Sequence, residues 1–525
     1  MDRRDLPVPD VRRHLGGKAL RRGLVGRLRH RRDRGEGVRG SDRGGGEDDL
    51  GDGQRCAHRG PVSPLRLCPR KPSPPDPRFL HLRVVPVSGA PGVRSRGRPG
   101  SALTTSPSRP RERSPERALR GTTRRWWGRG GAYAGRVPEF PYARLRRFPD
   151  VEAPNLQAWD ATDELLVARA LTLAAERGID GSAIAIIGDG YGALTLALTA
   201  AGLDGVRVHQ DLVTGRRALA RNAAELEATG FDAHELDAEL LRGARLVLLQ
   251  LPKGLAELEE IADTVARAAA PDAVLLAGGR VKHMTLAQND LLARYFGRVQ
   301  PQRAERKSRL IVATDPLPVP QDPPFPVSTT HPEYGLTLCA HGGAFAGDRI
   351  DIGTRVLLDV MRDRAAELAG LTAPTGLAQR DGFTAVDLGC GTGALAASLA
   401  LAVPDARIIA TDRSAAAVRS ARATMVANGV ADRVTVTLDD AGSEIPDGSV
   451  DLVLLNPPFH LGATVHEGAG RRLIDAAARV LRPGGEVWTV FNSHLDHRRA
   501  LAAAVGDTEQ LARTPKFTVT RSVRR

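Results

Sequence analysis

Cysteine is scarce in this sequence, with four residues among 525. The four show neither the spacing of metal ligands nor the density of a disulfide framework. No stretch is long and apolar enough to span a membrane, and the N-terminus lacks the apolar core of a secretory signal. We therefore expect a cytoplasmic protein without a metal site or a membrane partner, and we expect it to be a monomer. Cys390 falls inside a glycine-rich loop, where it is expected to be a small packing residue.

Residues 1–136 lack sustained apolar periodicity and are rich in Arg, Pro and Gly. Such a segment cannot bury enough surface to offset the entropy of ordering, so it is predicted to be disordered. It contains 31 Arg and 2 Lys against 13 acidic residues, a net charge of +20, whereas the remaining chain carries −6. Three interpretations are open: a basic arm that tethers RNA, an extension without a role, or a start placed too early, with translation beginning near Val137. Any RNA site in the folded part must then be a local patch.

From about Glu139 onward, apolar runs alternate with amphipathic stretches, which is the pattern of α/β domains with parallel sheets. We predict two such domains, residues 137–314 and 337–525. Five prolines between residues 316 and 324 predict a stiff linker, which we place at residues 315–336.

The two predicted domains look like copies of one another. Each has a small-residue loop after an apolar strand, and an Asp stands 23 residues after the leading glycine of that loop. One such match could be chance, but three in the same order predict tandem Rossmann-like domains. The matched segments are 185–194 with 385–395, 246–253 with 452–459, and the acids Asp211 with Asp412.

The second copy has the pattern of a nucleoside site. A strand over 384–388 leads into a loop of three spaced glycines and then an apolar helix over 394–402. Glycines there let the backbone pass close to a ligand, although the motif alone could equally bind a dinucleotide. Asp387, just before the turn, suits the cationic sulfonium of S-adenosylmethionine better than a pyrophosphate; its alternative role is a helix N-terminal cap. The loop glycines are Gly389, Gly391 and Gly393.

Two further acids follow the next strands of this copy. Asp412 ends the strand that begins at Ile408, where an acid can accept both ribose hydroxyls. A helix over 415–428 and a strand over 434–438 then lead to Asp439 and Asp440. Either could accept the adenine amino group, and we favour Asp440.

The catalytic motif is Asn456-Pro457-Pro458-Phe459, at the end of the strand over 452–455. Open α/β sheets bind ligands at this edge. The side-chain oxygen of Asn456 and the carbonyl of Pro457 can each accept a hydrogen bond from an exocyclic amine, which aims the nitrogen lone pair at a methyl donor. Phe459 can stack on a flipped base. The alternative is an ordinary strand-ending turn with two prolines, but its place after a glycine loop predicts amine methylation.

These segments resemble the bacterial ribosomal RNA guanine-N2 methyltransferases, the related enzymes of the small and large subunits. The resemblance covers about residues 140–525 and implies two class I methyltransferase domains, the first degenerate. It implies S-adenosylmethionine as cofactor and ribosomal RNA or a ribosomal subunit as partner. The stretches at 492–495 and 307–309 favour the large-subunit enzyme. The resemblance rests on residues 281–283, 307–310, 349–355, 387–393, 456–460, 492–495 and 516–519.

The family also implies roles for residues outside these motifs. Asp351, Gly353 and Thr354 would help enclose the cofactor, although Thr354 could instead cap the helix that runs through Met361. Three more polar residues could line the substrate side of the site, or be structural. These are His460, Asn492 and His494.

The first domain has lost the catalytic motif, since Gln250-Leu251-Pro252-Lys253 stands in its place. We predict that this domain binds no cofactor and helps to dock RNA. The alternative for the docking residues is a solvated charge run on a purely structural domain. They are Arg303, Arg306, Lys307 and Arg309.

Other functions remain open at this level. The same geometry could align the amide nitrogen of a protein glutamine, as in release-factor methylation, although those enzymes usually have tyrosine where Phe459 stands. DNA adenine methylation is a further alternative. A non-enzymatic RNA-binding or ribosome-assembly role would require the second site to be inactive as well, which Asn456 and Asp412 contradict.

Overall fold

The computed structural model describes residues 140–371, 382–457 and 466–525. The predicted disordered segment 1–136 lies outside these residues, as do Phe459 and His460 of the catalytic motif.

The first domain is built on a seven-stranded sheet of order β3-β2-β1-β4-β5-β7-β6. The first five strands are parallel, and β7 pairs antiparallel with β5 on one side and with β6 on the other. The strands are β1 (Ile184–Ile187), β2 (Val206–His209), β3 (Phe231–Ala233), β4 (Leu246–Gln250), β5 (Val274–Arg280), β6 (Phe296–Pro301) and β7 (Ser308–Pro316). The helices are α1 (Ala161–Arg177), α2 (Ala193–Ala200), α3 (Val213–Glu225), α4 (Ala238–Leu241), α5 (Leu255–Ala268) and α6 (Leu286–Leu292).

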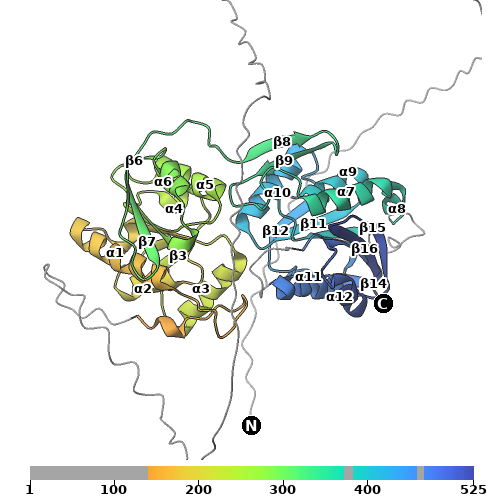
Figure 1. Ribbon diagram of the computed structural model, residues 1–525, viewed down its shortest axis with the longest axis horizontal. Helices are drawn as coiled ribbons and strands as arrows, with labels where there is room; N and C mark the ends of the chain where they lie inside the picture. The colour runs from red at the N-terminus through yellow and green to blue at the C-terminus, as the bar shows by residue number, and fades with distance from the viewer. Residues whose placement is uncertain (1–139, 372–381, 458–465) are drawn as a thin grey trace, which may run out of the picture. The chain divides into compact units, whose positions relative to one another are not determined.

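The second domain repeats this arrangement, with the strand order β12-β11-β10-β13-β14-β16-β15. Its strands are β10 (Thr384–Leu388), β11 (Arg407–Asp412), β12 (Val434–Leu438), β13 (Val450–Leu455), β14 (Leu481–Asn492), β15 (Thr508–Arg513) and β16 (Phe517–Val523). Its helices are α7 (Ile352–Asp363), α8 (Ala365–Gly370), α9 (Ala394–Ala402), α10 (Ala415–Ala427), α11 (His466–Val480) and α12 (His497–Ala504) (Figure 1). Since the order matches strand for strand, the predicted tandem Rossmann-like fold is confirmed.

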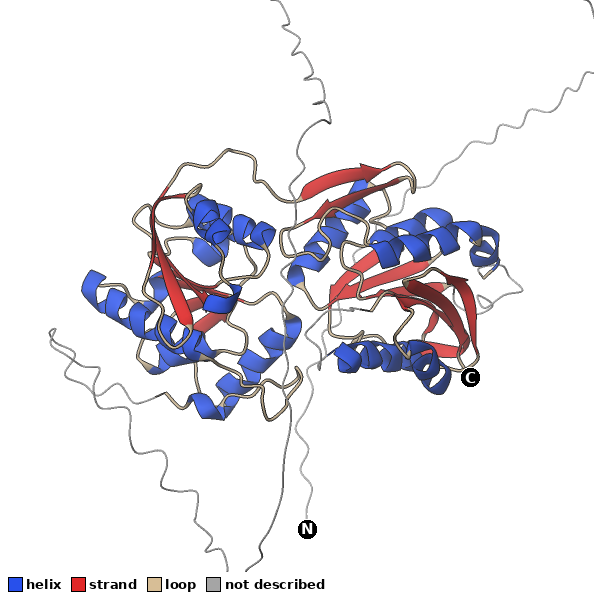
Figure 2. Ribbon diagram, viewed as in Figure 1, coloured by secondary structure: helices blue, strands red, loops and turns tan. Residues whose placement is uncertain are grey.

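The hydrophobic core of the second domain explains which segments became its central elements. β13 is buried along its whole length, as a central parallel strand must be. Helices α7, α9 and α10 pack on one face of the sheet, whereas α11 and α12 cover the other (Figure 2). Helix α9 is apolar on almost every side, because it lies between the sheet and its helical neighbours.

The segment between the domains is not entirely a linker. β7 continues to Pro316, and a hairpin of β8 (Val327–His331) and β9 (Leu336–Ala340) forms within and just after the range predicted as linker. Residues 317–326, between β7 and β8, hold most of the prolines and have no regular secondary structure. Alternation of Val, Thr and Leu with polar residues favours the short hairpin beyond it.

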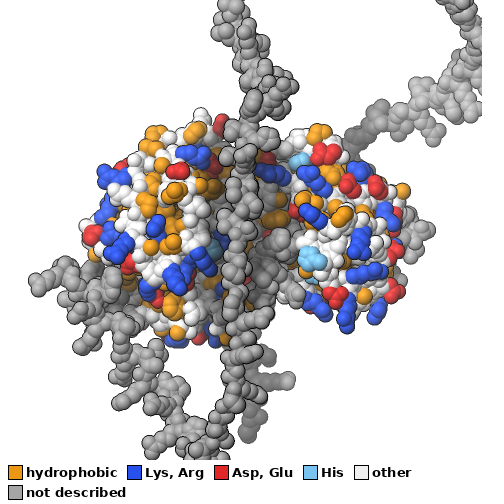
Figure 3. All heavy atoms as spheres, viewed as in Figure 1, with side chains coloured by type: hydrophobic (Ala, Val, Ile, Leu, Met, Phe, Trp, Pro, Cys, Tyr) orange, Lys and Arg blue, Asp and Glu red, His pale blue; other side chains and the backbone are white. Residues whose placement is uncertain are grey.

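Charge is dispersed on the part of the surface that Figure 3 presents: basic side chains stand among acidic and hydrophobic ones rather than in one field. Among the described residues, no helix combines the length and apolarity required to cross a bilayer.

Candidate functional site

The glycine loop of the second domain has the backbone of a ligand cradle. Gly389, Gly391 and Gly393 have φ values of 80°, 54° and 82°, a region that side chains with a Cβ disfavour. A Cβ at Gly389 or Gly391 would meet no atom within 4 Å, so space adjoins this backbone. At Gly393 a Cβ would lie 2.6 Å from Cε of Met425, so this glycine instead permits α9 to pack on α10. Space for a ligand therefore adjoins the first two glycines and not the third.

Asp387 lies buried beneath this loop. Its Oδ2 accepts a hydrogen bond of 3.0 Å from the backbone N–H of Ala396, in the first turn of α9. This is the helix-terminal contact that the sequence left as the alternative role. Burial raises the pKa of Asp387 to about 7.

Asp412 ends β11 and shapes the neighbouring loops. Its two oxygens accept from the backbone N–H groups of Gly391 and Ser414, both at 2.9 Å. Burial raises its pKa, and repulsion from Asp211 adds to the rise. The carboxylate therefore joins the glycine loop to the start of α10, where a ribose would lie in a Rossmann site.

The two acids after β12 have different environments. Asp439 accepts from four donors: the backbone N–H groups of Asp440 and Glu444 and the side chains of Ser443 and Arg217. Its carboxylate is thus occupied in forming the turn. Asp440 is also buried, but its carboxylate pairs with Arg472 of α11 through Oδ2. The second carboxylate oxygen leaves Asp440 better suited than Asp439 to accept from an adenine.

Asn456 directly follows β13 and is held by the start of α7. Its Nδ2 donates to Oδ2 of Asp351 at 3.2 Å and to Oγ1 of Thr354 at 2.9 Å. Because a carboxylate is only an acceptor, it fixes the amide with Nδ2 toward α7. Asn456 Oδ1 is buried and has no hydrogen-bond partner among the described residues. A buried acceptor without a donor costs free energy. This oxygen is therefore a candidate hydrogen-bond acceptor for a ligand.

The residues expected to enclose the cofactor gather around this asparagine. Asp351 is the N-cap of α7 and also accepts from the backbone N–H groups of Gly353 and Thr354. A Cβ at Gly353 would stand 3.1 Å from Oδ2 of Asp351 and 3.3 Å from Oδ1 of Asn456. The helix start therefore approaches the site closely, and Asp351 rather than Thr354 provides the cap.

The remaining predicted residues divide by location. Pro457 is buried beside Asn456. Asn492 ends β14, at the same sheet edge as Asn456, and is half-buried, whereas His494 is exposed. Sequence reasoning did not identify Phe517, whose ring lies 3.3 Å from a Cβ placed at Gly353. It also did not identify Arg472. Phe517 belongs to the segment 516–519, which carried part of the resemblance but gave this residue no role in the site, whereas Arg472 belongs to no local motif that could have revealed it.

The first domain keeps the framework of the site, but a side chain packs closely against the start of its glycine loop. Gln250, the counterpart of Asn456, donates through Nε2 to Asp163 of α1, as Asn456 does to Thr354 of α7. A Cβ at Gly188 would lie 3.3 Å from Cβ of Gln250, whereas the space at Gly389 is open. The loop residue Tyr191 bonds Asp150 at 2.7 Å and lies under the guanidinium of Arg147 at 4.5 Å.

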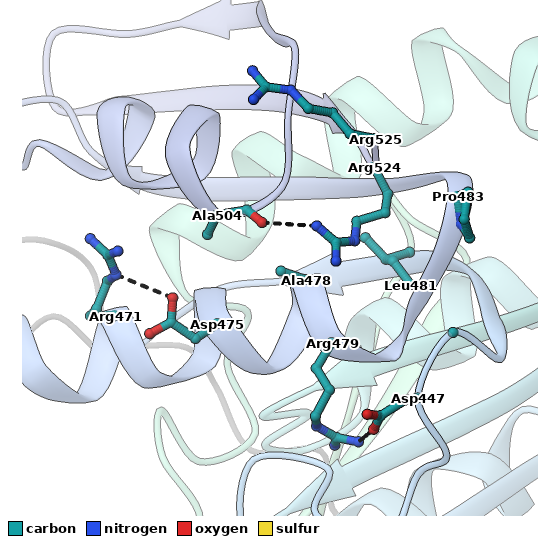
Figure 4. Close-up of a pocket in the computed structure, with 11 residues that line it drawn as sticks. Asp447, Arg471, Asp475, Ala478, Arg479, Leu481, Pro483, Ala504, Arg524 and Arg525 are labelled. Atoms are coloured by element: carbon teal, nitrogen blue, oxygen red, sulfur yellow. Dashed lines mark hydrogen bonds and ion pairs between the residues drawn. The ribbon is translucent and has the colours of Figure 1, made fainter.

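Another cavity of the second domain lies at the opposite edge of the sheet, where β14 begins (Figure 4). Two of its arginines form ion pairs within the domain: Arg471 with Asp475, and Arg479 with Asp447. It lies away from the strand ends that position Asn456, so it is not part of this site. Within the described residues there is also no group of three His, Cys, Asp or Glu that could hold a metal ion.

Two family models match the chain. Residues 138–316 match the RLMG N-terminal domain, and residues 335–521 match the methyltransferase small domain. The chain is 35% identical over 395 residues to ribosomal RNA large subunit methyltransferase G of Streptomyces coelicolor, covering 72% of this chain and 97% of that protein. It is also 35% identical over 397 residues to the protein of the same name from Stutzerimonas stutzeri, covering 74% and 99%.

A solved structure has the same fold. It is the T. thermophilus 16S rRNA N2 methyltransferase RsmC, in complex with AdoMet and guanosine, with a TM-score of 0.53 and 23% identity. The alignment covers 65% of this chain and 88% of that one, so the likeness spans both domains.

Proposed function

This chain belongs to the ribosomal RNA large subunit methyltransferase G family, and we propose that it transfers a methyl group from S-adenosylmethionine to the exocyclic N2 amine of a guanine in large-subunit ribosomal RNA. The family membership agrees with the resemblance predicted from the sequence. It also removes the reason to favour methylation of a protein glutamine, since the relatives that cover the chain are named for ribosomal RNA.

The observation that carries the proposal is the buried, unpartnered Oδ1 of Asn456. The contacts of Nδ2 with Asp351 and Thr354 leave this oxygen as the acceptor that faces the site. An amine N–H of guanine would supply the missing donor. We assign the carbonyl of Pro457 as the second acceptor and Phe459 as the stacking residue. Two fixed acceptors orient the amine, and positioning of this kind accounts for much of a rate enhancement.

The residues present fit S-adenosylmethionine. Open space adjoins Gly389 and Gly391, and we assign the carboxylate of Asp412, bonded to Gly391, to the ribose hydroxyls and the carboxylate of Asp440 to the adenine amine. Asp387, beneath the loop, is an acid that a cationic sulfonium tolerates nearby. When bound, the cofactor supplies an electrophilic methyl group. Asn456 and Pro457 hold the amine hydrogens, and the extra proton of the methylated amine passes to water because no residue named here is a strong base.

For the first domain we propose RNA docking without cofactor binding. Arg303 and Lys307 are exposed on the β6–β7 turn, and Ser308 pairs with Arg280 at the end of β5. The turn therefore lies at the carboxyl edge of the first sheet, with Arg306 and Arg309. The close packing of Gln250 against Gly188 and the absence of the Asn-Pro-Pro-Phe motif support the proposed lack of a cofactor. We also propose that the protein acts as a monomer in the cytoplasm.

Mass mapping of modified nucleosides tests the reaction and its substrate together. Large-subunit RNA from a strain that lacks the gene should lose one N2-methylguanosine, and a plasmid copy should restore it. A copy with Asn456→Ala should not restore it. Unchanged large-subunit RNA in the deletion strain would refute the proposed substrate.

A further inference from the structure

The acid at the ribose position of the first domain, Asp211, does not face a site of its own domain. Its backbone oxygen accepts from the N–H of Ala415 at 3.0 Å, and its Oδ1 accepts from the N–H of Ala416 at 2.8 Å. Both donors belong to the first turn of α10, in the second domain. The N–H of Val213 in turn donates to the oxygen of Arg413 at 2.9 Å. Residues 211–213 thus pair with residues 413–416.

These bonds complete the N-terminus of α10. The first N–H groups of a helix have no partner within the helix and need other acceptors. Ser414 supplies one, since its Oγ accepts from the N–H of Ala417 at 3.2 Å. The first domain supplies two more through Asp211. The start of this catalytic-domain helix is therefore capped from the degenerate domain.

The capped segment is the one that positions the ribose acid. Asp412 immediately precedes it, and Oδ1 of Asp412 accepts from the N–H of Ser414. Its Oδ2 accepts from Gly391 in the glycine loop. A shift of residues 413–416 would move both the carboxylate and its link to the glycine loop.

A second contact reaches the adenine side. Arg217 of α3, less than two turns after Asp211, donates to Oδ1 of Asp439 at 3.0 Å and to Oγ of Ser443 at 3.3 Å. Asp439 is almost fully buried and forms the turn that carries Asp440. A charge-assisted hydrogen bond to a buried carboxylate is among the stronger polar contacts in proteins.

We infer that Asp211 and Arg217 of the first domain are positioning residues for the cofactor: they hold the ribose and adenine loops of the second domain in their binding geometry. The inference rests on the proposed function, because it takes those loops as the S-adenosylmethionine site. It gives the degenerate domain a part in cofactor affinity without a cofactor of its own.

The test uses the full-length protein and measures S-adenosylmethionine binding by calorimetry. Asp211→Ala should weaken binding about threefold to tenfold, the effect of losing the side-chain hydrogen bond to Ala416, while the backbone bond to Ala415 remains. The KM for the cofactor should rise equally, while kcat at saturation stays within about twofold, as expected when only binding is lost. Asp211→Asn keeps the side-chain oxygen that accepts from Ala416 and should restore affinity.

A matched control separates this role from general docking of the two domains. Glu260 of α5 also reaches across, to His341, Gly342 and Arg419, but contacts neither cofactor loop. Glu260→Ala should lower the melting temperature and leave cofactor affinity within about twofold of wild type, since it removes only remote contacts. If Glu260→Ala weakens binding as much as Asp211→Ala, the inference is wrong.

Hydrogen exchange of the cofactor-free protein gives an independent readout. Amides 415–417 should lose protection in Asp211→Ala and keep it in Glu260→Ala. If Asp211→Ala does not fold, Arg217→Ala leaves the α10 cap in place and should weaken cofactor binding about threefold. If Asp211→Ala and Arg217→Ala both bind S-adenosylmethionine as tightly as the wild type does, the inference is wrong. A wild-type protein that binds no S-adenosylmethionine would overturn the proposed function, and the inference with it.

Discussion

The two domains share one strand order and differ in what occupies the site at the end of their central strands. In the second domain the glycine loop faces open space at Gly389, and Oδ1 of Asn456 is unpartnered. In the first, Gln250 packs against Gly188, and Tyr191 of the loop bonds Asp150. A few side chains, and not the sheet, therefore decide which domain has open space beside its glycine loop.

The buried acid of each loop makes the same point in another way. Asp387 reaches Ala396 of α9 from the strand, whereas Asp189 reaches Thr195 of α2 from within the loop itself. Ala396 and Thr195 each stand seven residues after the leading glycine of their loop. Both domains therefore satisfy the same helix amide with a carboxylate, but only the second leaves the loop clear of that side chain.

The largest difference between the two domains should appear when Asn456 and Gln250 are each replaced by alanine. Asn456→Ala should lower kcat about 1000-fold or more, because the acceptor that orients the amine is lost. Cofactor affinity should stay within about threefold, since Oδ1 faces the substrate. Gln250→Ala should leave both constants within about twofold. Methyl-transfer assays on ribosomal RNA and calorimetry measure the two; retained activity in Asn456→Ala would refute its role.

The number of cofactor sites per chain and their affinity also distinguish the two domains. Calorimetry of the wild type should give one S-adenosylmethionine per chain, because in the first domain Gln250 packs against Gly188 and replaces the asparagine of the catalytic motif. Asp412→Ala should weaken binding about 30- to 100-fold, as loss of charge-assisted bonds to two hydroxyls implies. Two sites per chain would contradict the comparison, and unchanged affinity would refute the ribose contact.

Reversal of charge on the first domain should act on RNA alone. The double variant Arg303→Glu, Lys307→Glu should raise the KM for ribosomal RNA about tenfold and make binding less dependent on salt, because fewer counterions are released. Cofactor affinity should not change. The control is the double variant Arg471→Glu, Arg498→Glu, which makes the same change in charge at exposed residues of α11 and α12 in the second domain. If both pairs have the same effect, the docking role of the β6–β7 turn is wrong.

The smallest effect concerns stability and pH. Burial raises the pKa of Asp387 to about 7, above the ordinary value of 3.8 for an aspartic acid, so the native state holds this proton more tightly than the unfolded state. The contribution of Asp387 to stability is therefore full below the unfolded pKa and is lost as pH rises toward 7. Asp387→Asn keeps an oxygen for Ala396 and should gain about 1 kcal/mol or more over the wild type between pH 5 and pH 8. Urea titrations of the cofactor-free protein measure this; parallel pH profiles would contradict it.

Much of the fold could be predicted because its signals are local. The strand over 384–388 and the helix over 394–402 have the predicted limits, since an apolar run and a glycine loop fix both within a few residues. The hairpin at 327–340 was not predicted, because the nearby prolines dominated the pattern.

The contacts within the site were beyond the sequence. Asn456 and Thr354 are 102 positions apart, and Asp211 and Ala416 are 205 apart. Sequence motifs suggested that Asp351 and Thr354 enclose a cofactor, but only the folded chain shows them holding the asparagine. Asp211 could be matched to Asp412 by its spacing, yet nothing local indicated that it caps a helix of the other domain.

The amide contact shared by the two domains bears on how a duplicated enzyme loses activity. Asn456 uses one end of its amide to anchor a helix and leaves the other end for chemistry, and Gln250 keeps the anchoring end through Asp163. Glutamine in place of asparagine is thus compatible with loss of catalysis in the first copy while the contact that anchors its helix is kept. In such a protein a retained polar residue is no sign of retained activity; the informative atom is the one that has no structural partner.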